Sequence, residues 1–260
     1  MKKDERFSHI LEAVMNNGQQ RVEELVLSLG VSAATIRRDL DALAKQQMIT
    51  RTHGGASRQS VDYDLPVRYR NTSRAQQKAA IGGVASQLVS KGDVIGLTGG
   101  TTTTAIVEAL LARPDLMEPS PTPNLTVVTT AINIAVQFSL RPQVRVVVSG
   151  GVAHPHSYEL VGPLAASVLS QITMDLSFIG VNALSPQFGA MIHDEGEAAI
   201  NALMASRSTK SYIVADSQKI GHTAFANVGS TSLFTGVITD AGIENEQAVA
   251  LRDAGFSVLT

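Results

Sequence analysis

The sequence predicts an α/β protein in two parts: a small N-terminal domain of helices closed by a β-hairpin, and a larger α/β domain with a mostly parallel sheet. Two observations predict this arrangement. Apolar residues recur at helical spacing up to residue 43, and an alternating segment follows at residues 48–56. From residue 76 onward, short continuous apolar runs alternate with helical patterns, which is typical of parallel strands covered on both faces.

A segment without periodicity separates the two parts. Residues 58–75 contain Pro66 and scattered charges, and we interpret them as a linker between a domain at residues 1–57 and a domain at residues 76–260. A chain of 260 residues is long enough for one large or two modest domains.

The composition is that of a globular protein. Hydrophobic residues make up 44% of the chain, and no apolar run approaches the length of about eighteen residues that a transmembrane helix needs. The N-terminal residues do not have the pattern of a signal peptide. Cysteine is absent, which excludes disulfides and thiolate metal sites. We therefore expect a cytoplasmic protein with no cofactor, no metal and no membrane partner.

Charge is distributed unevenly along the chain. Residues 1–74 carry twelve Lys or Arg and nine Asp or Glu, a net charge of +3, whereas residues 75–260 carry nine and fourteen, a net charge of −5. The total of −2 argues against a protein that is basic throughout. A basic front end on an acidic body has the sign expected of a DNA-binding domain attached to a larger domain.

The first two helices are expected at residues 4–16 and 22–29. Apolar residues in the first recur at i, i+3, i+4 and i+7, and Gly18 follows its end. The second ends at Gly30, which leads directly into a third helix. Two helices joined by so short a turn are a helix-turn-helix candidate.

The third helix, expected from Ala33 to Leu43, has two different faces. Ile36, Leu40 and Leu43 form an apolar stripe, and Ser32 stands at the N-cap position. The opposite face is small at its start and then basic, so that it fits closely against a DNA major groove. An ordinary amphipathic helix with a solvated Arg pair is the alternative. The residues of this face are Ala33, Ala34, Thr35, Arg37 and Arg38.

The alternating segment at residues 48–56 predicts a β-hairpin, which after a helix-turn-helix is called a wing. Arg51, His53 and the backbone N–H groups of Gly54 and Gly55 are candidates for contact with phosphate or the minor groove. A surface hairpin that only caps the domain is the alternative.

These residues resemble the DeoR family of bacterial transcriptional regulators. The resemblance covers residues 5–57 and rests on Thr35-Ile36-Arg37-Arg38-Asp39-Leu40, followed by His53-Gly54-Gly55-Ala56. It implies a winged helix-turn-helix domain with residues 32–38 presented to DNA. The candidate DNA-binding residues are Ser32, Ala33, Ala34, Thr35, Arg37, Arg38, Arg51, His53 and Gly54.

The second domain is expected to alternate strands and helices. Each strand ends in Gly, Ser, Thr or Asp, and ligands bind at this edge in open α/β sheets. Strands are expected at residues 94–97, 125–130, 144–148, 176–180, 211–215 and 235–239, and helices at 78–90, 131–139 and from the segment after the first strand through Leu111.

The sharpest ligand site in this domain is the loop Gly99-Gly100-Thr101-Thr102-Thr103. Glycines after a strand, followed by the free N–H groups of a helix start, are suited to a phosphate group. A plain β–α turn with threonine caps is the alternative. Other candidate ligand-binding segments are Ser149-Gly150-Gly151, the turn that contains Lys219, and a helix start with His193 and three acids, including Glu197.

The resemblance to the DeoR family extends here, through the Gly-Thr-Thr after a strand, Phe178-Ile179-Gly180, Glu197-Ala198 and the segment from Asp216 to Gly221. It implies a sensor domain related in fold to ribose-5-phosphate isomerase and glucosamine-phosphate deaminase. It also implies a phosphorylated sugar as effector. The candidate effector-binding residues are Gly99, Gly100, Thr101, Thr102, Thr103, Ser149, Gly150, Gly151, Glu197 and Lys219.

Three positions depart from the family pattern. The family commonly has Asp where this chain has Thr98, Asn where it has Thr130, and Lys near Asn201. The loss of the acid at position 98 removes an acceptor for sugar hydroxyl groups.

The sequence thus predicts a DNA-binding transcriptional regulator of carbohydrate metabolism genes, more commonly a repressor in this family, that binds an operator as a homodimer or homotetramer. The alternative is a sugar-phosphate isomerase or deaminase with an appended DNA-binding domain, in which Asp194, Glu197 and Lys219 do the acid–base chemistry. A third possibility is a DNA-architectural protein without a ligand.

Overall fold

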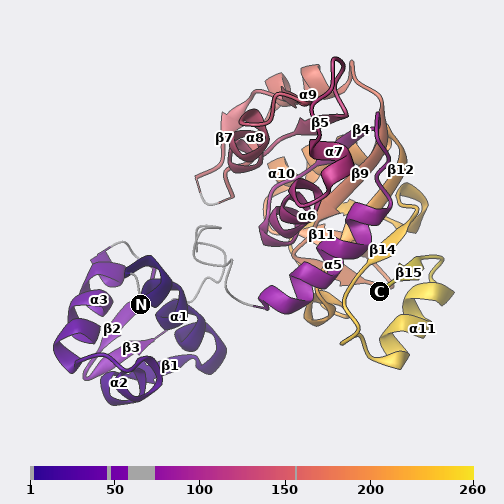
Figure 1. Cartoon of the computed structure of the whole chain (residues 1–260). Helices are drawn as coiled ribbons and strands as arrows, with labels where there is room; N and C mark the ends of the chain where they lie inside the picture. Colours follow the sequence, from indigo (N-terminus) through magenta and orange to yellow (C-terminus); the bar gives the residue numbers. More distant parts are fainter. Residues whose placement is uncertain (1–2, 46–47, 58–73, 156) are drawn as a thin grey trace. The chain divides into compact units, whose positions relative to one another are not determined.

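Two units divide the chain, Met1–Ala75 and Gln76–Thr260. The computed structural model describes residues 3–45, 48–57, 74–155 and 157–260 (Figure 1). Most of the expected linker, residues 58–73, lies outside the described residues. Each unit encloses its own buried apolar residues, so each is described by itself.

The N-terminal unit packs three helices against a small antiparallel sheet. Its elements are α1 (Lys3–Asn17), β1 (Gln19–Arg21), α2 (Val22–Leu29), α3 (Ala33–Lys45), β2 (Thr50–Thr52) and β3 (Gly55–Ser57), with strand order β1-β3-β2. The three predicted helices and the hairpin are confirmed. The strand β1 has no sequence signal of its own, because its three polar residues form a strand only by pairing with β3.

The helix-turn-helix geometry follows from two local features. Gly30 ends α2 in the left-handed conformation, with φ 64°, and its N–H donates to the carbonyl of Val26 at 3.0 Å. Ser32 Oγ accepts a hydrogen bond from the Thr35 backbone nitrogen at 3.2 Å, which confirms it as the N-cap of α3. The predicted stripe of Ile36, Leu40 and Leu43 is fully buried.

The C-terminal unit is built on a seven-stranded sheet in which every neighbouring pair is parallel. The predicted parallel sheet is therefore confirmed. Its strands are β4 (Val94–Leu97), β5 (Leu125–Thr129), β6 (Val144–Val148), β9 (Met174–Gly180), β12 (Ser208–Val214), β14 (Gly236–Ile238) and β15 (Ser257–Leu259).

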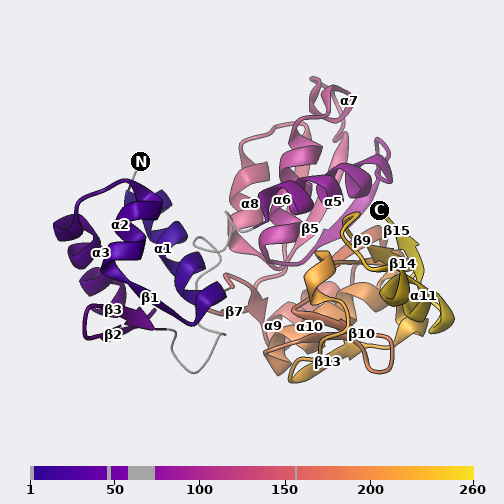
Figure 2. The same cartoon turned by 90° about the horizontal axis from the view of Figure 1, so that it is seen from below.

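Helices cover both faces of this sheet, as the continuous apolar strands require (Figures 1 and 2). The helices are α5 (Ala75–Gln87), α6 (Thr101–Leu111), α7 (Pro114–Met117), α8 (Ile132–Ser139), α9 (Pro163–Leu169), α10 (Glu195–Ser206) and α11 (Asn245–Asp253). The short strands β7 (Val152–Ala153) and β8 (Leu160–Val161) pair with each other, and β10 (Ala183–Ser185), β11 (Gly189–Ile192) and β13 (Ala226–Gly229) form a second antiparallel sheet.

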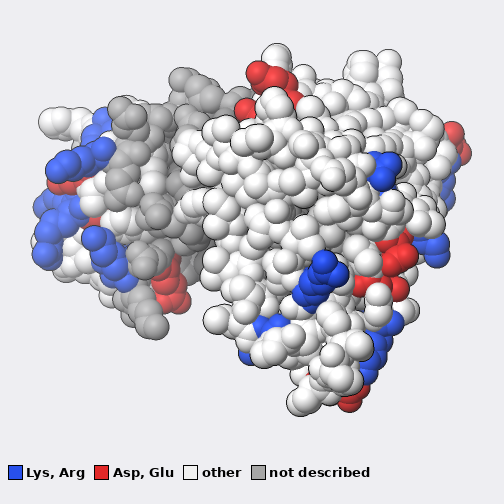
Figure 3. All heavy atoms as spheres, turned by 90° about the horizontal axis from the view of Figure 1, so that it is seen from above, with Lys and Arg blue, Asp and Glu red and all other residues white. Residues whose placement is uncertain are grey.

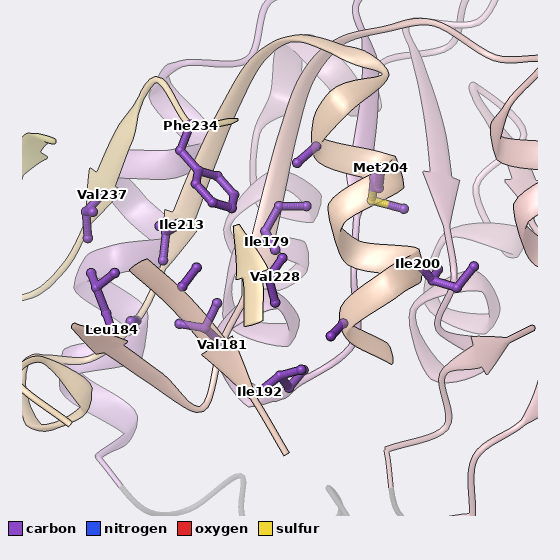
Figure 4. Close-up of a cluster of buried hydrophobic side chains, with 14 of the residues drawn as sticks. Ile179, Val181, Leu184, Ile192, Ile200, Met204, Ile213, Val228, Phe234 and Val237 are labelled. Atoms are coloured by element: carbon purple, nitrogen blue, oxygen red, sulfur yellow. The ribbon is translucent and has the colours of Figure 1, made fainter. Parts of the chain in front are cut away.

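One of the two cores of this unit lies between the sheet and α10 (Figure 4). Ile179 of β9 and Ile213 of β12 face Met204 of α10 and Val228 of β13 across it, and all four side chains are buried. This core holds α10, and with it the acidic start of that helix, in a fixed position on the sheet.

The path of the chain through the sheet reverses between β4 and β9. From β4 the chain adds β5 and β6 on one side, and it then returns to place β9, β12, β14 and β15 on the other side. In open parallel sheets, ligands bind outside the carboxyl ends of the two strands at such a reversal. The segments that follow β4 and β9 are therefore the place to search for a ligand site.

The expected helix at residues 78–90 is shifted, since α5 runs from Ala75 to Gln87. The strand β15 pairs with β14 at the end of the sheet and α11 packs against β15, and neither element is among those predicted. Within the described part of the chain, no helix has both the length and the apolar character needed to cross a membrane.

Candidate DNA-binding and effector-binding sites

The helix α3 presents a basic face to solvent. Arg37, Arg38, Ser32 and Ala34 are exposed, whereas the back of the helix is buried. On the face shown in Figure 3, Lys and Arg side chains gather on the N-terminal unit, whereas charges of both signs are scattered over the larger unit. Among the described residues, the contact of Arg38 is a long hydrogen bond, from Nε to the Ala34 carbonyl at 3.4 Å. Both guanidinium groups therefore remain available to a polyanion.

The orientation of α3 is fixed by an ion pair that the sequence interpretation missed. Asp39 is buried, and both of its carboxylate oxygens accept hydrogen bonds from Arg6 of α1, through Nε and, at 3.1 Å, through Nη2. The hydrogen bond to Asp39 raises the pKa of Arg6. The sequence signal for this ion pair is the position of Asp39 beside Leu40 and three residues after Ile36, which places an acid on the apolar stripe.

The hairpin places its candidate residues in two different situations. His53 and Gly54 are exposed at the turn. Arg51, in contrast, donates from Nε to Asp41 Oδ1 at 2.8 Å and from Nη1 to the Gly55 carbonyl. Its guanidinium group therefore fastens the hairpin to α3 in this structure rather than extending freely into solvent.

Gly55 has a structural reason to be glycine. A Cβ atom there would lie 2.1 Å from the carbonyl oxygen of Gln20 in β1. The close pairing of β1 with β3 leaves no space for a side chain, so this glycine of the His-Gly-Gly-Ala segment serves the sheet.

The loop after β4 has the geometry of an anion site at a helix start. Gly100 has φ 114° and ψ 167°, and α6 begins at Thr101 without a side-chain cap. The backbone N–H groups of the first turn of α6 have no intrahelical acceptor, as in every helix, and so face an incoming ligand. Thr103 Oγ1 and Thr104 Oγ1 both donate to the Gly100 carbonyl, at 2.9 and 2.8 Å, which stiffens this turn.

Thr102 stands apart from its neighbours in the loop. Its Oγ1 is buried and has no hydrogen-bond partner among the described residues. The Thr103 hydroxyl, in contrast, is already used within the turn, since it donates to the Gly100 carbonyl.

Glu159 is the residue of this site that sequence reasoning missed. Its side chain is 2% exposed, Oε1 accepts a hydrogen bond from the Gly99 backbone nitrogen at 2.7 Å, and Oε2 accepts one from Thr130 Oγ1 at 3.4 Å. Burial, together with the nearby charges of Glu197 and Asp194, raises the pKa of Glu159 well above its ordinary value. No motif surrounds Glu159 in the sequence, and an antiparallel bridge between Glu159 and Ala131, which follows β5, helps to bring it to the loop after β4.

Glu197 lies in a polar cluster at the start of α10. Ser157 Oγ donates to Glu197 Oε1, and His154 Nδ1 lies 3.4 Å from the same oxygen. Asp194 caps the helix, since its Oδ1 accepts from the Glu197 nitrogen at 2.8 Å. The segment between β7 and β8 and the start of α10 thus meet beside Glu159.

Lys219 also lies at the reversal of the sheet. Its Nζ donates to the Val181 carbonyl at 2.7 Å, directly after β9.

The loop Ser149-Gly150-Gly151 is different, because no described contact joins it to Gly99. Gly151 has φ 121°, and a Cβ there would lie 2.7 Å from the Val161 carbonyl oxygen, so this loop forms the tight turn that begins β7.

The three residues that depart from the family pattern are all buried in the sensor domain. Thr98 Oγ1 accepts from the Gly180 nitrogen at 2.9 Å, and Thr130 donates to Glu159. Asn201 is fully buried, and neither polar atom of its side chain has a partner among the described residues.

Two family models match successive parts of the chain. Residues 6–61 match the DeoR-like helix-turn-helix domain, and residues 73–241 match the DeoR C terminal sensor domain.

Relatives align over nearly the whole chain. The glycerol-3-phosphate regulon repressor of Escherichia coli (strain K12) is 30% identical over 241 residues, which are 93% of this chain and 92% of the relative. The HTH-type transcriptional regulator GlpR of Haloferax volcanii is 30% identical, with 98% and 96% coverage. The HTH-type transcriptional repressor CsqR of Escherichia coli (strain K12) is 29% identical, with 90% and 87% coverage.

Solved structures show a partial likeness. Ribose 5-phosphate isomerase A from Methanocaldococcus jannaschii has a TM-score of 0.42 at 16% identity, covering 56% of this chain and 55% of that chain. The sorbitol operon regulator SorC from Klebsiella pneumoniae has a TM-score of 0.37 at 12% identity, covering 87% and 97%.

The relatives named above are transcriptional regulators and repressors, so the protein is not the isomerase or deaminase of the alternative prediction. With a DNA-binding domain and a sensor domain matched in succession, the chain belongs to the DeoR family of DNA-binding transcriptional regulators.

Proposed function

We propose that the protein is a cytoplasmic repressor of carbohydrate metabolism genes, whose affinity for a double-stranded operator changes when a phosphorylated sugar binds to its sensor domain. The observation that carries the DNA part is the exposed pair Arg37 and Arg38 on a helix whose back is fully buried. Such a helix enters a major groove with its N-terminal residues against base edges.

The roles on DNA follow from chemistry and position. Arg37 and Arg38 bind phosphate or a guanine edge, for which guanidinium is well suited. Ser32, Ala33, Ala34 and Thr35 form the small front of α3 that approaches the bases. His53 and Gly54 at the hairpin turn contact the backbone or the minor groove, and Arg51 reaches DNA only by exchanging Asp41 for a phosphate.

The effector proposal rests on the position of the Gly99–Thr103 loop at the reversal of the sheet. The phosphate group binds to the backbone N–H groups at the start of α6, where the helix dipole favours a negative charge. Glu197 and Lys219 lie at the same edge of the sheet and contact the rest of the ligand. A relative is named for regulation of a glycerol-3-phosphate regulon, which supports a phosphorylated effector in this chain.

We propose a homodimer or homotetramer, because helix-turn-helix proteins commonly read two half-sites as symmetric dimers. The sensor domain has an apolar surface suited to this. Ile132, Val136 and Leu140 recur at four-residue spacing along and after α8 and are exposed, and Val148 is exposed on β6, the last strand of the sheet. An apolar surface of this kind is typical of a subunit interface.

Fluorescence anisotropy with DNA from the region upstream of the gene tests the DNA part. At one fixed salt concentration, the wild type binds specifically, and the double variant Arg37→Ala/Arg38→Ala loses about 100-fold or more in affinity. Arg252→Ala, which removes an exposed arginine from α11, is the matched control and binds as the wild type does. Equal affinity of the double variant and the control contradicts the assignment of α3.

A panel of phosphorylated sugars added to the complex tests the effector part. One of them changes the anisotropy of the wild-type complex, and Gly100→Val and Thr101→Ala respond weakly while still binding DNA. Valine at position 100 has to adopt φ 114°, which distorts the turn that holds the phosphate. A normal response of Gly100→Val contradicts the assignment of this loop.

A further inference from the structure

We infer that the effector carries a primary ammonium group in addition to its phosphate, and that Glu159 is the residue that binds this group. The inference rests on the proposed function, since it concerns the same ligand site. It begins from one fact: Glu159 is a carboxyl group almost completely withdrawn from water at the edge of the sheet where ligands bind.

The partners of Glu159 inside the protein are few. The Gly99 nitrogen donates to Oε1 at 2.7 Å, and the Thr130 hydroxyl donates a long hydrogen bond to Oε2 at 3.4 Å. In the part of the chain that the structure describes, no lysine, arginine or histidine forms an ion pair with this carboxylate. Buried carboxylates are normally paired with a cation, because removing the charge from water is costly.

The surroundings increase this cost. Glu197 and Asp194 are close enough to act on Glu159 through their charges, and both are acids. The imidazole of His154 lies 3.4 Å from Glu197 Oε1 and 3.8 Å from Asp194 Oδ2. A phosphate bound at the start of α6 adds further negative charge beside Gly99. An ammonium group on the same ligand offsets this charge, whereas a hydroxyl group does not.

Glu159 also packs tightly against the loop after β4. A Cβ atom on Gly99 would lie 2.6 Å from Glu159 Cγ, so the carboxyl group and the phosphate loop are packed directly against each other. A ligand held by its phosphate at the next residues of this loop therefore has its sugar beside Glu159. The family commonly has Asp at position 98, where this chain has Thr98. Glu159 therefore supplies a carboxylate in contact with the loop, through its hydrogen bond from the Gly99 nitrogen.

A metal ion is a poor explanation for this group of acids. Among the described residues, no three His, Cys, Asp or Glu side chains are arranged to hold one. In the loop itself, Thr102 Oγ1 is buried and has no hydrogen-bond partner among the described residues.

Isothermal titration of the full-length protein at pH 7 tests the inference. The probes are two pairs that differ at one group: glucosamine 6-phosphate with glucose 6-phosphate, and galactosamine 6-phosphate with galactose 6-phosphate. The wild type binds the amino sugar of at least one pair about tenfold or more tightly than its partner. Glu159→Gln keeps an acceptor for the Gly99 nitrogen but has no charge, so it still binds the sugar phosphate that lacks an amino group. In this variant the two sugars of a pair differ in affinity by twofold or less.

The preference is a ratio measured within one variant, so a general loss of stability does not imitate the expected result. Glu246→Gln, an exposed acid at the start of α11, is the matched control and keeps the wild-type ratio. The N-acetyl derivative of the preferred amino sugar phosphate, which has no charge on nitrogen, binds no better than the hydroxyl sugar.

The outcomes separate this inference from the proposed function. Equal affinities within both pairs overturn the inference and leave a sensor of neutral sugar phosphates. A preference that persists in Glu159→Gln also overturns it, because another acid is then responsible. If none of the four phosphates binds but another phosphorylated sugar of the panel changes the anisotropy of the DNA complex, the inference alone is wrong. If no phosphorylated sugar of the panel has an effect either, the sensor proposal is wrong as well.

Discussion

The Thr98 hydroxyl accepts a hydrogen bond from the backbone nitrogen of Gly180 at 2.9 Å, and it joins the two segments that follow β4 and β9. These are the strands between which the path of the chain reverses. The side chain of Thr98 is completely buried, so the Gly180 nitrogen has no substitute partner nearby in water. A residue that departs from the family pattern thus holds the ligand edge of the sheet together.

Thr98→Val tests this relationship. Valine has nearly the same shape but no acceptor, so the Gly180 nitrogen is left unpaired, and we expect the free energy of unfolding of the sensor domain to fall by about 2 kcal/mol. Thr98→Ser keeps the hydroxyl acceptor, so its free energy of unfolding falls by less than that of Thr98→Val. Urea denaturation followed by circular dichroism measures both. Equal stability of the valine and serine variants is inconsistent with a structural role for this hydrogen bond.

Asp39→Ala is expected to weaken DNA binding although Asp39 lies on the buried side of α3. The substitution leaves Arg6 without its carboxylate partner and frees α3 from α1, at a cost of about 3 kcal/mol in the stability of the N-terminal domain. Asp41→Ala, in which an exposed carboxylate on the same helix is removed, costs less than about 1 kcal/mol. Thermal unfolding and anisotropy compare the two, and a smaller effect of Asp39→Ala than of Asp41→Ala goes against this assignment.

Gly99→Ala and Glu159→Ala are expected to compensate for each other. Alanine at position 99 brings its Cβ to 2.6 Å from Glu159 Cγ, so the single variant has to move Glu159 or the loop and loses stability by about 1–3 kcal/mol. Removing the Glu159 side chain opens the space, and the double variant is more stable than the sum of the two single effects predicts. A thermodynamic cycle measured by urea denaturation gives the coupling energy, and additive effects mean that the two residues are not in contact.

The stability of the sensor domain is expected to fall as pH rises because of Glu159. The pKa of Glu159 in the folded protein is raised well above its ordinary value of 4.5, so the folded state binds the proton more tightly than the unfolded state does. The contribution is fully present below pH 4.5 and is lost as pH rises through the folded-state pKa. Glu159→Gln has no such proton, so its stability relative to the wild type increases from acidic pH to pH 8. Parallel stability–pH curves for the two proteins argue against a raised pKa at this position.

The sequence by itself determined the elements that depend on local patterns. The stripe of Ile36, Leu40 and Leu43, the N-cap Ser32 and the stop at Gly30 define the helix-turn-helix through contacts within a few residues, and such patterns are read directly from the chain. The strands β4 and β5 are likewise visible as apolar runs, because they lie inside the sheet and are largely buried on both faces.

Only the tertiary structure decided which of these elements meet. The order of strands places the reversal between β4 and β9, and no local pattern contains that order. Glu159 reaches Gly99 across 60 positions of the chain, and Arg51 turns to Asp41 rather than to solvent. The physical reason is the same in each case: helix and strand periodicity is set by neighbours along the chain, whereas the partner of a buried charge is set by packing between distant segments.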